Sequence, residues 1–224
     1  MILKKSHKLS IFIMLLVVIV LTSVTYYNNA KNDRLPVLKP TDVNPELVDP
    51  SVRVAGSHTI ADFELLDQRG KSVDNSVVDG KIYVADFFFS TCQTICPIMT
   101  GQMSRVATAF QGDQSVKFMS FSVLPDVDVP EVLNAYADKN KANYTQWKFI
   151  TGDKKVIYEL ARKSYFTLKQ AEVGNGDGGD SDFIHTNNFV LVDTKGQIRG
   201  YYDGTSLREV DQLIEDIELL KKNG

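Results

Sequence analysis

Residues 81–97, KIYVADFFFSTCQTICP, carry the strongest indication of the fold. Residues 81–89 form a short, densely apolar run, which is typical of a central β-strand buried on both faces of a sheet. Pro97 stands where an α-helix can begin, because its missing N–H costs little in the first helical turn. Two cysteines lie in the turn between strand and helix. Ligands bind at the carboxyl ends of strands in an open α/β sheet, so we expect the functional site here.

The sequence on both sides of this stretch alternates between strand and helix patterns. Further strands are expected at 63–66, 71–73, 116–123, 147–150, 188–193 and 197–202. Helices are expected at 97–110, 130–140, 156–166 and 207–220. Early alternation followed by a closing hairpin and helix predicts the α/β class: a three-layer α/β/α sandwich with a mixed sheet.

Residues 1–29 predict a membrane anchor. The run 9–24 is almost wholly apolar, near the short end of the roughly 17–25 residues that span a bilayer as a helix. Three lysines precede it, which keeps the N-terminus in the cytoplasm and places the rest outside the cell membrane, in the periplasm. A cleaved signal peptide is the alternative, although a cleavage site ending at Ala30 matches poorly. Either interpretation exports the domain.

The remainder divides into a linker and one domain. Residues 30–55 contain four prolines and no sustained period, which favours an extended linker, so a domain over 56–224 is expected. Its size suits a single hydrophobic core. The net charge of −3 provides no basic field for nucleic acid, which excludes that class of partner.

The only two cysteines, Cys92 and Cys96, are too few for a disulfide scaffold. Redox exchangers usually space their cysteines by two residues. Here three residues intervene, so the two sulfurs can lie farther apart and chelate one soft ion. Two thiolates suit Cu(I), and an added imidazole would also accept Cu(II). His185, directly before a predicted strand, is the best placed of the three histidines, yet its position equally allows a loop histidine bonded to backbone.

Other side chains near the cysteines admit two interpretations each. Asp86 interrupts the apolar strand six residues before Cys92, as a buried acid does in thioredoxins, and either moves protons for the thiols or is a strand-edge carboxyl without a chemical role. Met99 and Met103 lie a helical turn apart and are expected in the core rather than on a metal.

Residues 87–97, FFFSTCQTICP, resemble the copper-site motif of the Sco/SenC family. Gln93 departs from the proline that the family often has after its first cysteine. Similarity extends over about residues 56–220 and includes His185. It implies a thioredoxin-like fold, copper bound by Cys92, Cys96 and His185, and maturation of the CuA site of cytochrome c oxidase.

Two functions remain open after this resemblance. The first is a metallochaperone that passes copper to the CuA-bearing oxidase subunit and needs a thiol reductant, because an oxidising compartment would close the cysteine pair into a disulfide. The second is an enzyme, a thiol–disulfide oxidoreductase in which Cys92 attacks a partner and Cys96 resolves the mixed disulfide.

Overall fold

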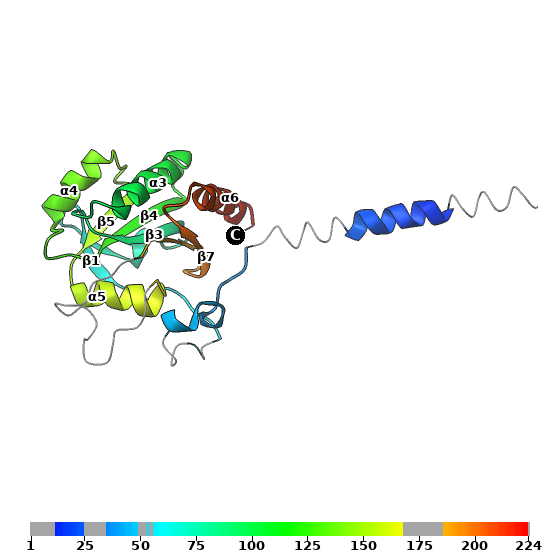
Figure 1. The fold of residues 1–224 in the computed structure, drawn as a ribbon, viewed down its shortest axis with the longest axis horizontal. Coiled ribbons are helices and arrows are strands. Elements are labelled where there is room, and N and C mark those ends of the chain that lie inside the picture. The colour runs from blue at the N-terminus through cyan, green and yellow to red at the C-terminus, as the bar shows by residue number, and fades with distance from the viewer. Residues whose placement is uncertain (1–11, 25–34, 49–52, 54–55, 168–185, 224) are drawn as a thin grey trace, which may run out of the picture. The chain divides into compact units, whose positions relative to one another are not determined.

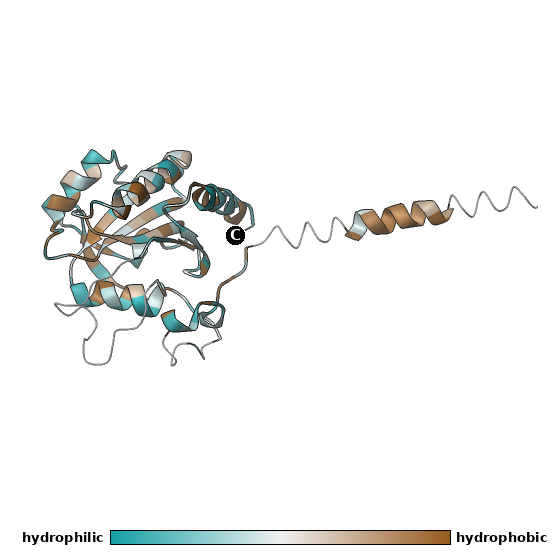
Figure 2. Ribbon diagram, viewed as in Figure 1, coloured by the Kyte–Doolittle hydropathy of each residue, from teal (hydrophilic) through white to brown (hydrophobic). Residues whose placement is uncertain are grey.

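The computed structural model describes residues 12–24, 35–48, 53, 56–167 and 186–223. Met1–Leu35 and Pro36–Gly224 are separate compact units. In the first unit, residues 12–24 are helical and exposed, and Figure 2 shows this helix as apolar along its length. No described helix has the length and apolar content needed to cross a bilayer. The helix over 12–24 lies within the anchor expected over 1–29, and the rest of that stretch lies outside the described residues.

The second unit is built on one seven-stranded mixed sheet in the order β2-β1-β5-β4-β3-β6-β7. The central strand β3 runs parallel to β4, and β4 runs parallel to β5, while β6 pairs antiparallel with β3. The strands are β1 Glu64–Asp67, β2 Ser72–Asp74, β3 Ile82–Phe88, β4 Val116–Ser122, β5 Trp147–Thr151, β6 Asn188–Val192 and β7 Ile198–Asp203. The mixed α/β sheet is confirmed.

Helices cover both faces of this sheet (Figure 1). They are α3 Ile95–Ala109, α4 Pro130–Lys139, α5 Lys154–Glu159, which continues into a π-helical turn at Leu160–Ser164, and α6 Leu207–Asn223. Neighbouring residues of β3 point to opposite faces. Phe88 contacts Tyr136 of α4, whereas Phe87 contacts Tyr165 beyond α5. Helix α4 therefore lies on one face of the sheet and α5 on the other.

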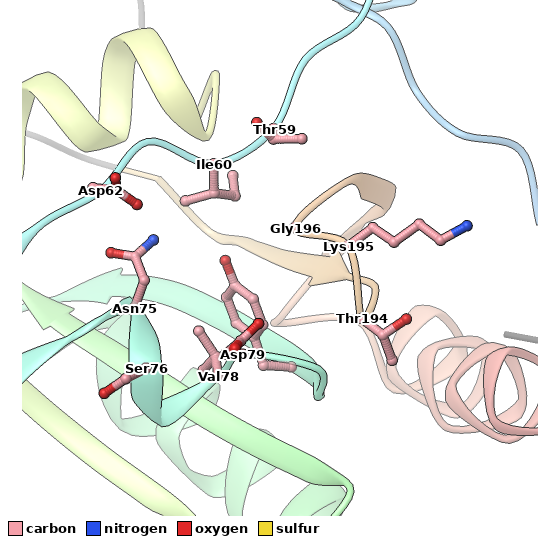
Figure 3. Close-up of a pocket in the computed structure, with 11 residues that line it drawn as sticks. Thr59, Ile60, Asp62, Asn75, Ser76, Val78, Asp79, Thr194, Lys195 and Gly196 are labelled. Carbon is pink, nitrogen blue, oxygen red and sulfur yellow. The ribbon is translucent and has the colours of Figure 1, made fainter.

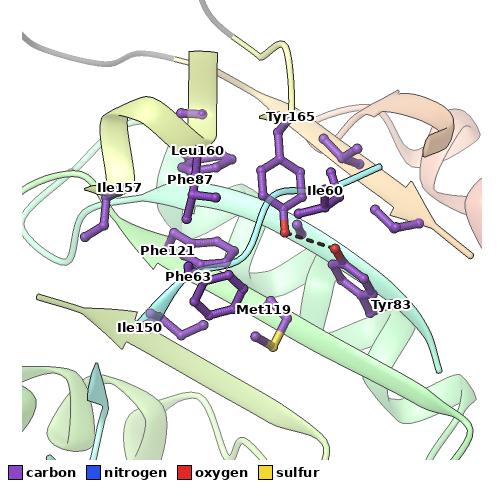
Figure 4. Close-up of a cluster of buried hydrophobic side chains, with 14 of the residues drawn as sticks. Ile60, Phe63, Tyr83, Phe87, Met119, Phe121, Ile150, Ile157, Leu160 and Tyr165 are labelled. Carbon is purple, nitrogen blue, oxygen red and sulfur yellow. Dashed lines mark hydrogen bonds between the residues drawn. The ribbon is translucent and has the colours of Figure 1, made fainter. Parts of the chain in front are cut away.

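Aromatic side chains fill the core under α5 (Figure 4). Phe87 stacks on Phe121 with ring centroids 5.3 Å apart, and Phe63 meets Phe121 edge-on at 5.6 Å. The hydroxyls of Tyr83 and Tyr165 are 3.1 Å apart within this core. Every residue of β3 is buried, as the sequence predicted for a central strand. This rigid strand fixes where the following turn begins.

The N-terminal part of the second unit packs on the sheet. Leu38 N donates to Ile198 O of β7 at 2.8 Å, and Arg199 Nε donates to Pro36 O at 2.9 Å. The side chain of Val48 is only 2% exposed and belongs to the core cluster. The compact unit thus includes part of the proline-rich stretch 30–55.

Candidate metal and thiol site

The two cysteines lie where β3 gives way to α3. Strand β3 ends at Phe88 and helix α3 begins at Ile95, two residues before the expected start at Pro97. Cys92 lies in the intervening turn and is half-buried, while Cys96 lies in the first turn of α3 and is buried. Pro97 fits within that first turn because the N–H groups there lack intrahelical acceptors.

The surroundings of Cys92 favour its thiolate. Burial by itself raises the pKa of Cys92, but donors around the sulfur outweigh it and lower the pKa to about 7. These donors are the backbone N–H groups of Cys96 and Thr94, the Thr94 hydroxyl at 3.6 Å from Sγ, and the Cys96 thiol. A sulfur at a helix N-terminus gains stabilisation from the unpaired N–H groups there. Cys92 is thus an accessible nucleophile and a soft ligand near neutral pH.

The surroundings of Cys96 favour its protonated form. Its side chain is 4% exposed, and this burial, reinforced by the nearby negative charges of Cys92 and Asp86, raises its pKa to about 12. The backbone N–H of Phe89 opposes this rise only in part. The two thiols therefore differ in both access and acidity although four positions separate them.

Asp86 lies inside the molecule beneath these thiols. It is in the central strand and only 2% exposed, so the strand-edge interpretation is wrong. Burial raises its pKa to about 7, although Ser120 Oγ donates to Oδ1 at 2.5 Å and partly opposes the rise. Ser120 Oγ accepts in turn from Trp147 Nε1 at 2.9 Å. The carboxyl therefore carries an exchangeable proton near neutral pH close to Cys96.

The residues expected to bind metal are only partly described. His185 lies outside the described residues, so the geometry of a three-ligand site is a prediction. Among the described residues no group of three His, Cys, Asp or Glu side chains forms a metal site. Met99 and Met103 are fully buried, in keeping with a core role. The donors that are described, an ionisable thiol and a second thiol hydrogen-bonded to it, fit a soft ion such as Cu(I).

Two further polar contacts lie on either side of the cysteine turn, and no sequence pattern indicated them. The buried carboxylate of Asp128 accepts from Ser90 N at 3.0 Å and from the Ser90 hydroxyl. The phenol oxygen of Tyr136 is 2.8 Å from Thr100 Oγ1 on α3. Their partners are 38 and 36 positions away in sequence, so no local pattern could indicate them.

A cavity among the described residues lies away from the cysteines. A hollow of about 490 Å³ is lined by Asn75 and Ser76, by Tyr83 near the start of β3, and by Thr194–Gly196 in the β6–β7 turn (Figure 3). Neither cysteine lines it. Because β3 carries its cysteine turn at the opposite end, this cavity is not part of the thiol site.

Comparison with known proteins is consistent with this arrangement. The SCO1/SenC family model matches residues 53–222, which include both cysteines and the whole sheet. The chain belongs to the SCO1/SenC family. A curated family relative, the SCO1 protein homolog of Bacillus subtilis, is 31% identical over 72% of this chain and 82% of its own length.

Two solved structures extend the comparison of this SCO1/SenC protein. BsSco, described as a member of the Sco family of cytochrome c oxidase assembly proteins with a disulfide switch, is 28% identical, with a TM-score of 0.62 over 76% of this chain and 98% of its own. ScoI of Bradyrhizobium japonicum with copper bound is 23% identical, with a TM-score of 0.57 over 73% and 99%. The thioredoxin-like fold of the family is thus confirmed for this chain.

Proposed function

We propose that this protein is a copper metallochaperone that binds one copper ion through Cys92, Cys96 and His185 and delivers it to the CuA site of cytochrome c oxidase. The observation that carries the proposal is the pair of hydrogen-bonded thiols in the turn before α3 and in its first helical turn. The thiol in the turn, Cys92, is half-buried, and its pKa is lowered to about 7. Such a sulfur binds a soft ion without a large cost of deprotonation at neutral pH.

Each residue has a separate task in this proposal. Cys92, the more exposed and more acidic thiol, receives the ion first and is the ligand that an incoming partner thiolate can replace. Cys96 holds the ion from the buried side and must lose its proton on binding, since its pKa is raised to about 12. The imidazole of His185 supplies the third ligand, which extends the site from Cu(I) to Cu(II).

Relatives support the choice of metal and recipient. ScoI of Bradyrhizobium japonicum was solved with copper, and BsSco belongs to a family of cytochrome c oxidase assembly proteins. The FFFSTCQTICP motif at 87–97 resembles the family's copper-site motif. By the same reasoning we infer that the recipient is the CuA-bearing oxidase subunit, and that a thiol reductant keeps the pair open for loading.

The proposal also places the domain outside the cytoplasm. The apolar run 9–24 with three lysines before it supports a single membrane anchor with its N-terminus in the cytoplasm. The domain would then face the periplasm on a tether, where it meets a membrane-bound oxidase. Membrane fractionation with an alkaline wash tests this arrangement: a chain that washes off the membrane contradicts the anchor.

An anaerobic copper titration of the reduced full chain in detergent tests the metal site. The expected result is one Cu(I) per chain, with binding lost in Cys92→Ser and weakened in His185→Ala. His58→Ala is the matched control, because His58 contacts Phe166 and Ser164, with Nε2 2.7 Å from Ser164 O. Unchanged affinity in His185→Ala would remove the histidine from the site, and a reduced chain that binds no copper would end the proposal.

A second function, thiol–disulfide exchange, is favoured by the unequal acidity of the two thiols. The Cys92 thiolate would attack a partner disulfide, forming a mixed disulfide and releasing one partner thiolate. Cys96 would then lose its proton and attack Cys92 Sγ, releasing the second partner thiolate and leaving a Cys92–Cys96 disulfide. Two electrons thereby pass to the partner, and an external thiol reductant restores the pair.

His185→Ala separates the two functions. A metallochaperone loses copper affinity in this variant. An oxidoreductase keeps its rate of disulfide reduction, because the histidine is neither the attacking nor the resolving group. Measuring both properties on one preparation shows which of them depends on the imidazole.

A further inference from the structure

The segment from Asp128 to Tyr136 contacts the chain on both sides of the cysteines. It comprises the end of the loop after β4 and the first two turns of α4. Asp128 reaches Ser90, two positions before Cys92, and Tyr136 reaches Thr100, four positions after Cys96. One segment therefore contacts both flanks of the thiol-bearing stretch 90–100.

Asp128 forms the contact on the strand side. Its carboxylate is fully buried, and it accepts from the backbone N–H and the hydroxyl of Ser90. It also accepts from Ser122 Oγ at 2.5 Å, at the end of β4. A buried carboxylate is costly unless it is hydrogen-bonded, and these three donors satisfy it. The carboxylate thus links Ser122, which forms the last ladder pair with Phe88, to Ser90, two residues beyond the end of β3.

Tyr136 forms the contact on the helix side. Its ring packs between Phe88 and Phe149, with centroids at 5.3 and 5.7 Å, which fixes where the phenol oxygen lies. That oxygen is 2.8 Å from the Thr100 hydroxyl, and Thr100 is 4% exposed. Residues four apart share one face of a helix, so Thr100 lies one turn below Cys96.

We propose that Asp128 and Tyr136 are positioning residues that hold Cys92 and Cys96 at the separation which copper binding and disulfide formation require. This proposal rests on the thiol site described under the proposed function. Within the turn, Cys92 N donates to Phe89 O over a long 3.3 Å, and the other bonds given above run to the two sulfurs themselves. Because both flanks are already held, the turn loses less conformational entropy when copper binds or when the disulfide forms.

The proposal predicts a specific effect of Asp128→Asn. The amide keeps the size of the side chain, but its NH₂ group cannot accept from Ser90 or Ser122. Without these bonds the chain at Ser90 is less firmly held, so the effective concentration of one cysteine sulfur near the other falls. We expect the Cu(I) affinity to fall at least tenfold. We also expect the dithiol–disulfide equilibrium to move at least tenfold toward the dithiol, which corresponds to about 30 mV for a two-electron couple.

Tyr136→Phe and Thr100→Val test the helix-side flank with smaller changes. Each removes one partner of the same hydrogen bond and keeps the packing nearly intact. Each should shift copper affinity and disulfide equilibrium in the same direction as Asp128→Asn, by about threefold. The double variant should be no worse than either single one, because the residues act through one bond. Tyr144→Phe is the matched control, since the Tyr144 hydroxyl donates to Asp138 on α4.

The readouts separate positioning from general stability. Both equilibria are measured on the full chain in detergent, by competition with a Cu(I) chelator and by titration against glutathione redox buffers. A merely structural role lowers the unfolding midpoint and leaves both equilibria at their wild-type values, which overturns the proposal. If Asp128→Asn does not fold, the same two equilibria measured in Tyr136→Phe and Thr100→Val decide between a positioning role and a merely structural one. If the wild type binds no copper, the proposed function fails, and the disulfide equilibrium alone still tests the positioning residues.

Discussion

At the scale of single residues, Cys92 and Cys96 are unequal, and their reactivity should show it. Only the thiolate is alkylated. Because the pKa of Cys92 is lowered to about 7 and that of Cys96 is raised to about 12, Cys92 should react with iodoacetamide at a rate that is half-maximal near pH 7. Cys96 should stay unmodified at pH 8. Peptide mass spectrometry after timed quenching measures both, and equal labelling of the two cysteines at pH 7 would contradict the assignment.

Asp86 should make the stability of the protein depend on pH. Its folded pKa of about 7 lies above the ordinary value of 3.8, so the unfolded chain loses this proton first as the pH rises. The unfolding free energy contributed by Asp86 is therefore highest below pH 4 and falls until about pH 7. At about 1.4 kcal/mol per pKa unit, the fall is about 4 kcal/mol.

Asp86→Asn removes this dependence. The stability of the variant relative to the wild type should rise by about 4 kcal/mol between pH 4 and pH 8, as measured by urea unfolding of the reduced proteins. Ser72→Ala, an exposed change on β2, is the control. A constant difference between wild type and Asp86→Asn across this range would show that the carboxyl does not titrate there.

The sequence singled out candidate residues more readily than it indicated their state. Spacing and position made Cys92 and Cys96 candidates, and the offset of six residues drew attention to Asp86 with two interpretations open. The difference in acidity between the thiols depends on backbone N–H groups and on burial, which exist only once α3 is formed. Asp128 went unnoticed because an acid in a polar turn looks ordinary until its burial is known.

At the scale of elements, apolar periodicity predicted most strands and helices, and the errors lie at their ends. Helix α3 starts at Ile95 rather than Pro97, because proline is tolerated throughout the first turn and does not mark its first residue. The helix expected over 156–166 is α5 followed by a π-helical turn, which side-chain periodicity does not reveal. The antiparallel pairing of β1 with β5 depends on contacts distant in sequence.

The buried face of helix α3 should be what holds this helix against the sheet. Met103 is fully buried, so Met103→Ala should leave a cavity and lower the unfolding free energy by about 2–5 kcal/mol. Ile98→Ala on the same helix, where the side chain is 50% exposed, should change it by less than about 0.5 kcal/mol. Chemical denaturation followed by Trp147 fluorescence measures both. Similar losses in the two variants would mean that α3 is not held by this face.

At the scale of the whole molecule, the domain depends on chain that precedes its first strand. The sequence pattern predicted a spacer over 30–55, since proline content indicates extended backbone but not whether that backbone packs. In the structure the compact unit begins at Pro36. Residues 36–38 bond to β7, an edge strand of the sheet, and Val48 enters the core. An edge covered in this way is protected from pairing with other chains.

A chain beginning at Gly56 should therefore be less stable than one beginning at Pro36. Loss of the Val48 side chain from the core alone lowers the unfolding free energy by about 1.5–3 kcal/mol. Loss of the hydrogen bond from Leu38 N to Ile198 O of β7 adds to this decrease. Urea unfolding of the two chains measures the difference. Within the longer chain, Val48→Ala should reproduce part of the loss, whereas Glu46→Ala, an exposed change in the same segment, should not. Identical unfolding midpoints for the two chains would show that the segment serves only as a tether.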